Sequence, residues 1–172
     1  MPVRRIVSKG IGFIVLGVFG ALLACHGTGS AQAKLVIDRP PADVWNVVAD
    51  GSAYADWNPF ITRVDGEFRE GAKVRIVIGT PPDAITFTPT VLFVHPGSGL
   101  CWRGSVWIRG IFDGEHCIRL SSVDGRTLVE QSERFTGLLA GRLTESIVRD
   151  TQAQFQAMNT ALKRRVESAE GS

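Results

Sequence analysis

The chain has 172 residues, 44% of them hydrophobic and 21% charged, which is the composition of one globular domain. Its formal net charge is +2, but residues 1–33 contain three basic residues and no acidic one, which leaves 16 basic and 17 acidic residues and a net charge of −1 for the rest. A near-neutral body lacks the clustered Lys and Arg that nucleic-acid binding needs, so we exclude nucleic acid as a partner.

Residues 1–33 have the pattern of an export leader. Three basic residues precede the uncharged apolar stretch 11–24, and Ala31-Gln32-Ala33 offers an A-x-A cleavage site. The segment 22–25 (LLAC) resembles a bacterial lipobox, so Cys25 is a candidate lipidation site. A leader that is retained as a membrane anchor is the third alternative. We therefore expect an exported protein, periplasmic or extracellular, or one that is anchored to the membrane and faces outward.

The folded body is expected at residues 34–168, followed by a frayed tail at 169–172. Residues 34–38 predict a short strand. Pro40 and Pro41 then begin a short helix whose apolar side chains form one stripe. A second helical turn ends at Pro59.

Apolar residues next alternate in runs that turn signals separate, which predicts antiparallel strands at 61–68, 73–78, 85–95, 100–107, 113–121 and 126–136. After Gly137 the apolar period changes to three or four residues and predicts one long helix, from Leu138 or Leu139 to about Val166. The order β-α-α-β6-α, with about seven strands, indicates an α+β fold. In it a curved antiparallel sheet wraps the long C-terminal helix and leaves an internal cavity, with the loop 79–84 as a lid.

Alternation along the strands predicts which side chains face that cavity. The apolar candidates on the strands are Phe87, Val91, Phe93, Trp102, Ile118 and Phe135. The candidates on the helix are Ile147, Phe155 and Met158. Trp57 and Asn58 belong to a loop that could line the mouth. The alternative is that the same residues fill a solid core.

Three polar residues, His116, Gln131 and Glu133, fall on the same inward face. A buried carboxylate beside an imidazole can transfer protons, so Glu133 and His116 are the candidate catalytic pair. The alternative is structural: Glu133 pairs with a nearby arginine and His116 caps a loop. The sequence has no activated nucleophile, no dinucleotide or phosphate-binding motif and no metal-ligand spacing, so we expect no cofactor and no metal.

Cys101 and Cys117 fall on consecutive strands, on the face away from Trp102 and His116. In an oxidising compartment they could form a cross-strand disulfide. Two buried free thiols are the alternative.

Four segments together resemble one known superfamily. They are PPADVW at 40–45, YADWNPF at 54–60, FDGEH at 112–116 and ERFTG at 133–137. The chain resembles the START-like (SRPBCC) superfamily, which has the helix-grip fold, and within it the bacterial polyketide cyclase/dehydrase and lipid-transport group. The resemblance covers about residues 34–168. It implies a hydrophobic ligand in an internal cavity and leaves the chemistry open, because fold does not determine function.

These observations favour the binding of a hydrophobic small molecule such as a lipid, a sterol or a polyketide-like compound, and they are compatible with its transport. The first alternative is a cyclase/dehydrase-type enzyme that uses Glu133 with His116. The second is a non-catalytic protein-interaction module with a closed interior. The leader adds an expected contact with a membrane.

Overall fold

The computed structural model describes residues 27–106 and 108–168, apart from the side chains of residues 106 and 141–144. A five-stranded antiparallel sheet is formed, in spatial order, by β1 (Gly27–Ile37), β8 (Arg126–Gly137), β7 (Phe112–Val123), β6 (Gly99–Val106) and β5 (Thr90–His95). A second sheet is formed by β2 (Ile61–Asp65), β3 (Arg75–Ile78) and β4 (Ile85–Phe87). The helices are α2 (Pro41–Ala49), the 3-10 turn η1 (Gly51–Ala53), α3 (Tyr54–Trp57) and α4 (Ala140–Glu167).

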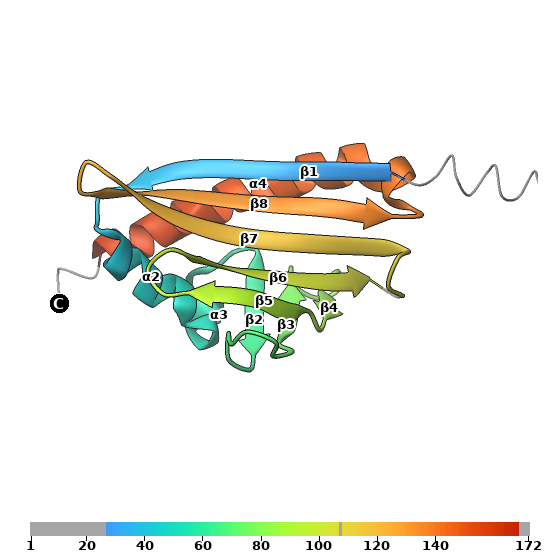
Figure 1. The fold of residues 1–172 in the computed structure, drawn as a ribbon, viewed down its shortest axis with the longest axis horizontal. Coiled ribbons are helices and arrows are strands. Elements are labelled where there is room, and N and C mark those ends of the chain that lie inside the picture. The colour runs from blue at the N-terminus through green and yellow to red at the C-terminus, as the bar shows by residue number, and fades with distance from the viewer. Residues whose placement is uncertain (1–26, 107, 169–172) are drawn as a thin grey trace, which may run out of the picture.

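The long helix α4 runs along one face of the large sheet, against β1 and β8 (Figure 1). The predicted α+β helix-grip fold, with a curved antiparallel sheet around a long C-terminal helix, is confirmed. Helix α4 also lies within a residue or two of its predicted bounds. Across the described residues, no helix combines the length and the apolar character that a membrane span requires.

Strand β1 begins earlier than the predicted strand at 34–38. It starts at Gly27 and pairs with β8 over its whole length, from Gly27 opposite Gly137 to Ile37 opposite Thr127. Ala31 and Ala33, the two alanines of the A-x-A pattern, are buried against Phe155 of α4. Gln32 between them is exposed, as are Ser30 and Lys34 on either side. The alternation of a strand was therefore present, but the same residues also fit a cleavage site.

The single strand predicted at 85–95 is wrong in two respects. It is broken between Phe87 and Thr90, so that β4 belongs to the small sheet and β5 to the large one. Pro89 lies at this break, where it has no N–H to donate to a ladder. This break raises the strand count to eight. A register shift then occurs between Val91, which is opposite Trp102, and Phe93, which is opposite Cys101.

The C-terminal half of α4 covers a solid core. Met158 and Leu162 are fully buried against strand residues such as Leu100, Ile118 and Val129. Helix α2 closes this end with Val44 and Val48, which are also fully buried. Each large apolar side chain buried here contributes about 1.5–3 kcal/mol to folding.

The segment between α2 and β2 is held by its own polar groups. The Tyr54 hydroxyl donates to the Val48 carbonyl at 2.8 Å. Burial, reinforced by the negative charge of Asp50, raises the pKa of Tyr54 well above its usual value. Tyr54 therefore stays a neutral donor at physiological pH, and this part of the sequence motif serves the fold.

Candidate functional site

A cavity of about 320 Å³ lies between the first half of α4, the large sheet and the β3–β4 hairpin. Five aromatic side chains line it: Phe60, Phe87, Trp102, Phe112 and Phe135. Four isoleucines add to the apolar wall: Ile61, Ile78, Ile85 and Ile147. The floor is the sheet, where Trp102 and His116 are almost fully buried, and the exposed residues Ile85, Asp150 and Gln154 lie at the rim. The volume lies at the lower end of the range for small-molecule sites.

Two facing glycines help to explain why the interior is hollow here. Gly104 of β6 pairs with Gly114 of β7, and both line the cavity. A Cβ on Gly104 would lie 3.0 Å from the Phe87 ring, and a Cβ on Gly114 would overlap the Glu133 carboxylate. Without side chains at these positions, the ring and the carboxylate lie flat against the sheet and the space below α4 stays open.

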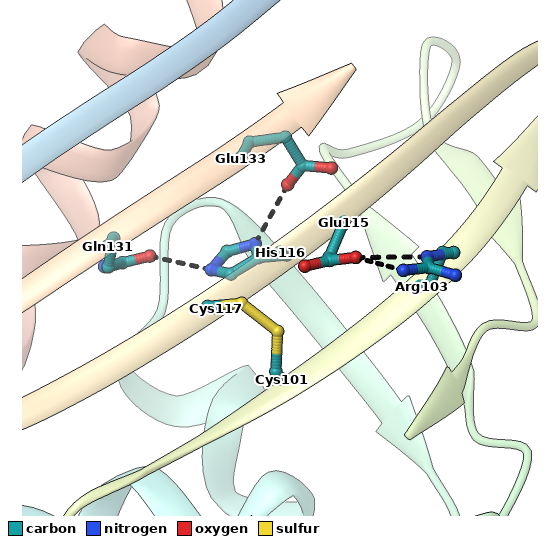
Figure 2. The surroundings of a disulfide bond; sticks show 7 residues. All are labelled: Cys101, Arg103, Glu115, His116, Cys117, Gln131 and Glu133. Atoms are coloured by element: carbon teal, nitrogen blue, oxygen red, sulfur yellow. Dashed lines mark hydrogen bonds and ion pairs between the residues drawn. A yellow bond between two sulfur atoms is a disulfide. The ribbon is translucent and has the colours of Figure 1, made fainter. Parts of the chain in front are cut away.

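His116 and Glu133 are brought together at the floor of the cavity (Figure 2). They are directly opposite each other on β7 and β8. The His116 Nδ1 lies 3.3 Å from Glu133 Oε2, and the two side chains are 4% and 14% exposed. Both side chains line the cavity, and Glu133 is the more exposed of the two.

The other ring nitrogen of His116 belongs to a buried chain of amides. His116 Nε2 lies 3.2 Å from Gln131 Oε1 (Figure 2). Gln131 Nε2 in turn donates to Asn159 Oδ1 of α4 at 2.8 Å. With the Gln131 amide in this orientation, its oxygen faces the histidine, so His116 Nε2 is the donor.

This orientation of the Gln131 amide has a consequence for the contact between His116 Nδ1 and Glu133. A neutral imidazole that is protonated at Nε2 has only a lone pair at Nδ1. A hydrogen bond between Nδ1 and Glu133 Oε2 therefore needs one more proton, carried by the ring or by the carboxyl group. The pair can hold a transferable proton beside the cavity, which is the requirement for acid–base chemistry.

Aromatic rings fix the histidine in place. The Trp102 ring stacks on the His116 ring with centroids 4.5 Å apart. The Phe155 ring, on α4, packs against the same imidazole with centroids 4.7 Å apart. Phe68 stacks in turn on Trp102 at 5.6 Å. The imidazole is therefore held rigidly, as a positioned functional group needs to be.

Six of the residues predicted to face a ligand line the cavity: Phe87, Trp102, His116, Glu133, Phe135 and Ile147. Five others are buried between the sheet and the helix without lining the cavity: Val91, Ile118, Gln131, Phe155 and Met158. Val91, Ile118 and Met158 belong to the packed core. The structure thus brings both groups to the space between sheet and helix. Their part in ligand binding stays a prediction.

Phe93 was predicted to face inward, and this is wrong. Because of the register shift after Val91, Phe93 lies opposite Cys101 and shares its outward face, where it stacks on His95 at 4.8 Å. Its neighbour Val94 packs against the core instead. The extra residue in β5 reverses the alternation from this point on.

Trp57 and Asn58 do not line the cavity. Asn58 is buried, and its Oδ1 accepts from the backbone N–H groups of Phe60 and Ile61, both at 2.9 Å. Trp57 borders a separate open groove of about 640 Å³ along the outer side of α4. That groove is larger, but it lies away from the His116–Glu133 pair and it follows a stripe of alanines, so we take the enclosed cavity as the site.

Cys101 and Cys117 are opposite each other on β6 and β7 and form a disulfide, with Cα atoms 4.1 Å apart. Figure 2 shows this bond bridging β6 and β7 close to the His116–Glu133 pair. Glu115 lies close to both sulfur atoms, but the sulfurs are bonded to each other and its carboxylate pairs with Arg103. The sequence left open a disulfide or two buried free thiols, and the structure has the disulfide.

Several lining residues were not predicted from the sequence: Phe60, Ile61, Ile78, Ile85, Gly104, Ser105, Phe112, Gly114, Asp150, Thr151 and Gln154. Most belong to the second sheet or to α4, whose positions over the large sheet no local pattern reveals. A usable signal existed for Gly104 and Gly114, because both fall at inward positions where other residues of the same strands are large.

The sequence and the fold were compared with those of known proteins. The family model described as "Polyketide cyclase / dehydrase and lipid transport" matches residues 28–167. No curated protein sequence matches the chain. Among solved structures, the Zhui aromatase/cyclase from Streptomyces sp. R1128 is 22% identical with a TM-score of 0.66, over 85% of this chain and 99% of that one.

Two further structures have the same fold. Norcoclaurine synthase from Thalictrum flavum is 11% identical with a TM-score of 0.66, over 85% of this chain and 98% of that one. Ara h 8.0201 is 14% identical with a TM-score of 0.66, over 83% of this chain and 99% of that one. These identities establish the shared fold alone.

Proposed function

Since this chain belongs to the polyketide cyclase/dehydrase and lipid transport family, we propose that it binds a hydrophobic small molecule in the cavity beneath α4. The observation that carries the proposal is the cavity itself, which is lined by five aromatic rings and four isoleucines, with Glu133 and His116 at its floor. Transfer of apolar ligand surface from water into such a site is favourable by about 25 cal/mol per Å².

The lining also limits the class of ligand. Flat aromatic walls such as Phe87, Trp102 and Phe135 suit a ring system or an unsaturated chain. Glu133 provides one polar anchor beside His116. Its carboxylate accepts a hydrogen bond from a ligand hydroxyl, and it donates one to a ligand carbonyl when it carries the proton that the pair shares. A polyketide-like aromatic compound and a sterol both have this combination.

Filling the cavity tests the proposal. Thr151 lines the cavity, whereas its neighbour Gln152 is exposed on the same helix. We expect Thr151→Trp to abolish displacement of a bound naphthalene-sulfonate dye by polyketide-like aromatics and sterols, and the matched variant Gln152→Trp to leave it intact. Native mass spectrometry of the protein from its own source should show a bound mass that Thr151→Trp loses.

Dye that binds equally to both variants would place the apolar site elsewhere. A protein that carries no ligand and displaces no dye would favour an interaction module with a closed interior.

The His116–Glu133 pair supports a second candidate function, an enzyme of the cyclase/dehydrase type. In that case the Glu133 carboxylate would take a proton from a carbon next to a carbonyl group of the bound compound, and the proton on His116 Nδ1 would pass to the departing hydroxyl group, which leaves as water. Glu133→Gln keeps the shape of the side chain and removes the base. A carrier should then retain its affinity within a few-fold, whereas an enzyme should lose turnover by roughly 10²–10⁴-fold.

A further inference from the structure

Three chain segments that are distant in sequence meet at one end of the molecule. Gly27, at the start of β1, lies opposite Gly137 at the end of β8. The backbone N–H groups of Leu138 and Leu139 donate to the carbonyls of Gly110 and Ile111, both at 3.0 Å. The start of the described chain, the β6–β7 turn (residues 108–111) and the beginning of α4 therefore form one structural unit, at the right of Figure 1.

The cavity lies next to this end. Phe112, which follows the β6–β7 turn directly, lines the cavity and stacks on Phe135 at 5.4 Å. Ile85, on the cavity rim, is 49% exposed. Ile147, one of the lining residues of α4, lies in the part of the helix nearest to its start. A ligand that leaves past the rim would leave close to this end of the molecule.

The same end presents an exposed apolar side chain on a fixed support. Ile108, in the β6–β7 turn, is 70% exposed. The turn is held by the bonds to Leu138 and Leu139, by a bond from Ile111 N to Ile108 O at 3.0 Å, and by the Asp113 carboxylate, which accepts from Gly110 N at 3.0 Å. Because the turn is already ordered, Ile108 can enter an apolar contact without the entropy cost of ordering a loose loop.

The sequence before Gly27 bears on the choice of occupant for this surface. Cleavage after Ala33 would remove residues 27–33, which pair with β8 and bury Ala31 and Ala33. The fold therefore favours the two alternatives that keep β1: a lipid on Cys25, or retention of the apolar stretch 11–24. Only His26 separates Cys25 from β1, so a lipidated Cys25 would hold the membrane within roughly 7 Å of this end. The disulfide between Cys101 and Cys117 supports the oxidising compartment that such a leader leads to.

We propose that this end of the molecule, presented by Ile108 and Ile85, docks on the surface of a lipid bilayer and aims the cavity mouth at it. The inference rests on the proposed function, because it supplies the route by which a hydrophobic ligand passes between membrane and cavity without crossing water. Arg109 is exposed beside Ile108 and suits anionic headgroups. Asp150 at the rim opposes that attraction, so the contact is chiefly apolar.

The first test measures contact in the full chain. Ile108→Trp and the matched variant Val123→Trp are reconstituted in phosphatidylethanolamine–phosphatidylglycerol vesicles that contain brominated lipid, which quenches tryptophan on contact. Val123 is 37% exposed and lies at the β7–β8 hairpin, the opposite end of the molecule (Figure 1). After subtraction of the unsubstituted protein, the tryptophan at 108 should be quenched and the one at 123 should not. Equal quenching, or none, would overturn the proposal.

The second test measures exchange. Ile108→Asp should slow the transfer of an anthroyloxy-labelled fatty acid from the protein to the same vesicles roughly tenfold, because it removes one buried isoleucine from the docked state. Val123→Asp should leave the rate unchanged, and both variants should bind the probe equally at equilibrium. An unchanged rate in Ile108→Asp would contradict docking.

Other outcomes separate the two proposals and exclude another occupant. A protein that binds neither the fatty-acid probe nor the naphthalene-sulfonate dye but shows quenching at 108 would refute the proposed function and leave docking in place. A dimer in detergent that Ile108→Asp converts to a monomer would show that a second copy covers this surface, and the membrane proposal would then be wrong.

Discussion

The two halves of the interior beneath α4 differ, although one sheet and one helix enclose both. Towards the C-terminal end of α4, Met158 and Leu162 are fully buried in one cluster with Leu100, Ile118 and Val129. Towards its N-terminal end, aromatic side chains surround an open volume above Gly104 and Gly114. The packed half supplies stability and the hollow half supplies the site, so substitutions in the two halves should have opposite profiles.

The largest expected effect is in the packed half. Leu162→Ala should lower the free energy of unfolding by about 3 kcal/mol, because it empties a fully buried position that cannot collapse. Ile147→Ala, on the same helix but at the cavity wall, should cost about 1 kcal/mol and instead weaken ligand binding. Urea denaturation and dye titration of both variants measure the difference. Equal costs would mean that the hollow half is packed in solution.

The disulfide should contribute to stability without affecting the cavity. Replacing both Cys101 and Cys117 with Ala should cost about 2–3 kcal/mol, given a loop closed over a sequence separation of 16 residues. Reductant should lower the free energy of unfolding of the unsubstituted protein, measured by urea denaturation, by a similar amount. It should not change the free energy of unfolding of the double variant. Detection of both thiols by alkylation under denaturing, non-reducing conditions would contradict the bond.

Gly114→Ala sharpens the comparison inside the hollow half. The added methyl group would overlap the Glu133 carboxylate and force it away from the sheet. We expect a cost of about 1 kcal/mol and weaker binding of ligands that carry a hydroxyl or a carbonyl group. Gly104→Ala is the control, because it presses on the Phe87 ring and leaves Glu133 in place. Identical selectivity in the two variants would argue against Glu133 as the anchor.

The smallest expected effect is a loss of stability at low pH, which arises from Glu167 near the C-terminal end of α4. The pKa of Glu167 is lowered, first by the hydrogen bond from Lys163 and then by the backbone N–H of Asp38. Because the folded state binds this proton less readily than the unfolded state does, the stabilisation is present above the ordinary value of 4.5 and is lost as the pH falls through the lower folded value. For so exposed a pair the loss should be under about 1 kcal/mol.

Lys163→Met should flatten this part of the stability–pH curve, as measured by urea denaturation at acid and neutral pH. A curve of unchanged slope in that variant would exclude the pair as its source.

Local patterns predicted much of this arrangement. The change from a two-residue to a three-to-four-residue period placed α4 almost correctly, and alternation brought His116 and Glu133 to one face. The errors lie where one residue disturbs a pattern. Pro89 ends a strand in the middle of an apolar run, and the extra residue after Val91 turns Phe93 outward. Strand β1 was shortened because small buried alanines also fit a cleavage signal.

The sequence by itself determined the fold class, the order of the elements apart from the division of the strand at 85–95, and many of the inward-facing side chains, because these depend on periodicities that neighbouring residues carry. Only the tertiary structure decided that half of the interior is hollow, that Cys101 and Cys117 are opposite each other in bonded register, and that Ile108 lies at the same end as Gly27. A cavity is the difference between the space that several strands and a helix enclose and the side-chain volume that fills it. That difference depends on registers and packing distances between distant segments, which no single stretch of sequence contains.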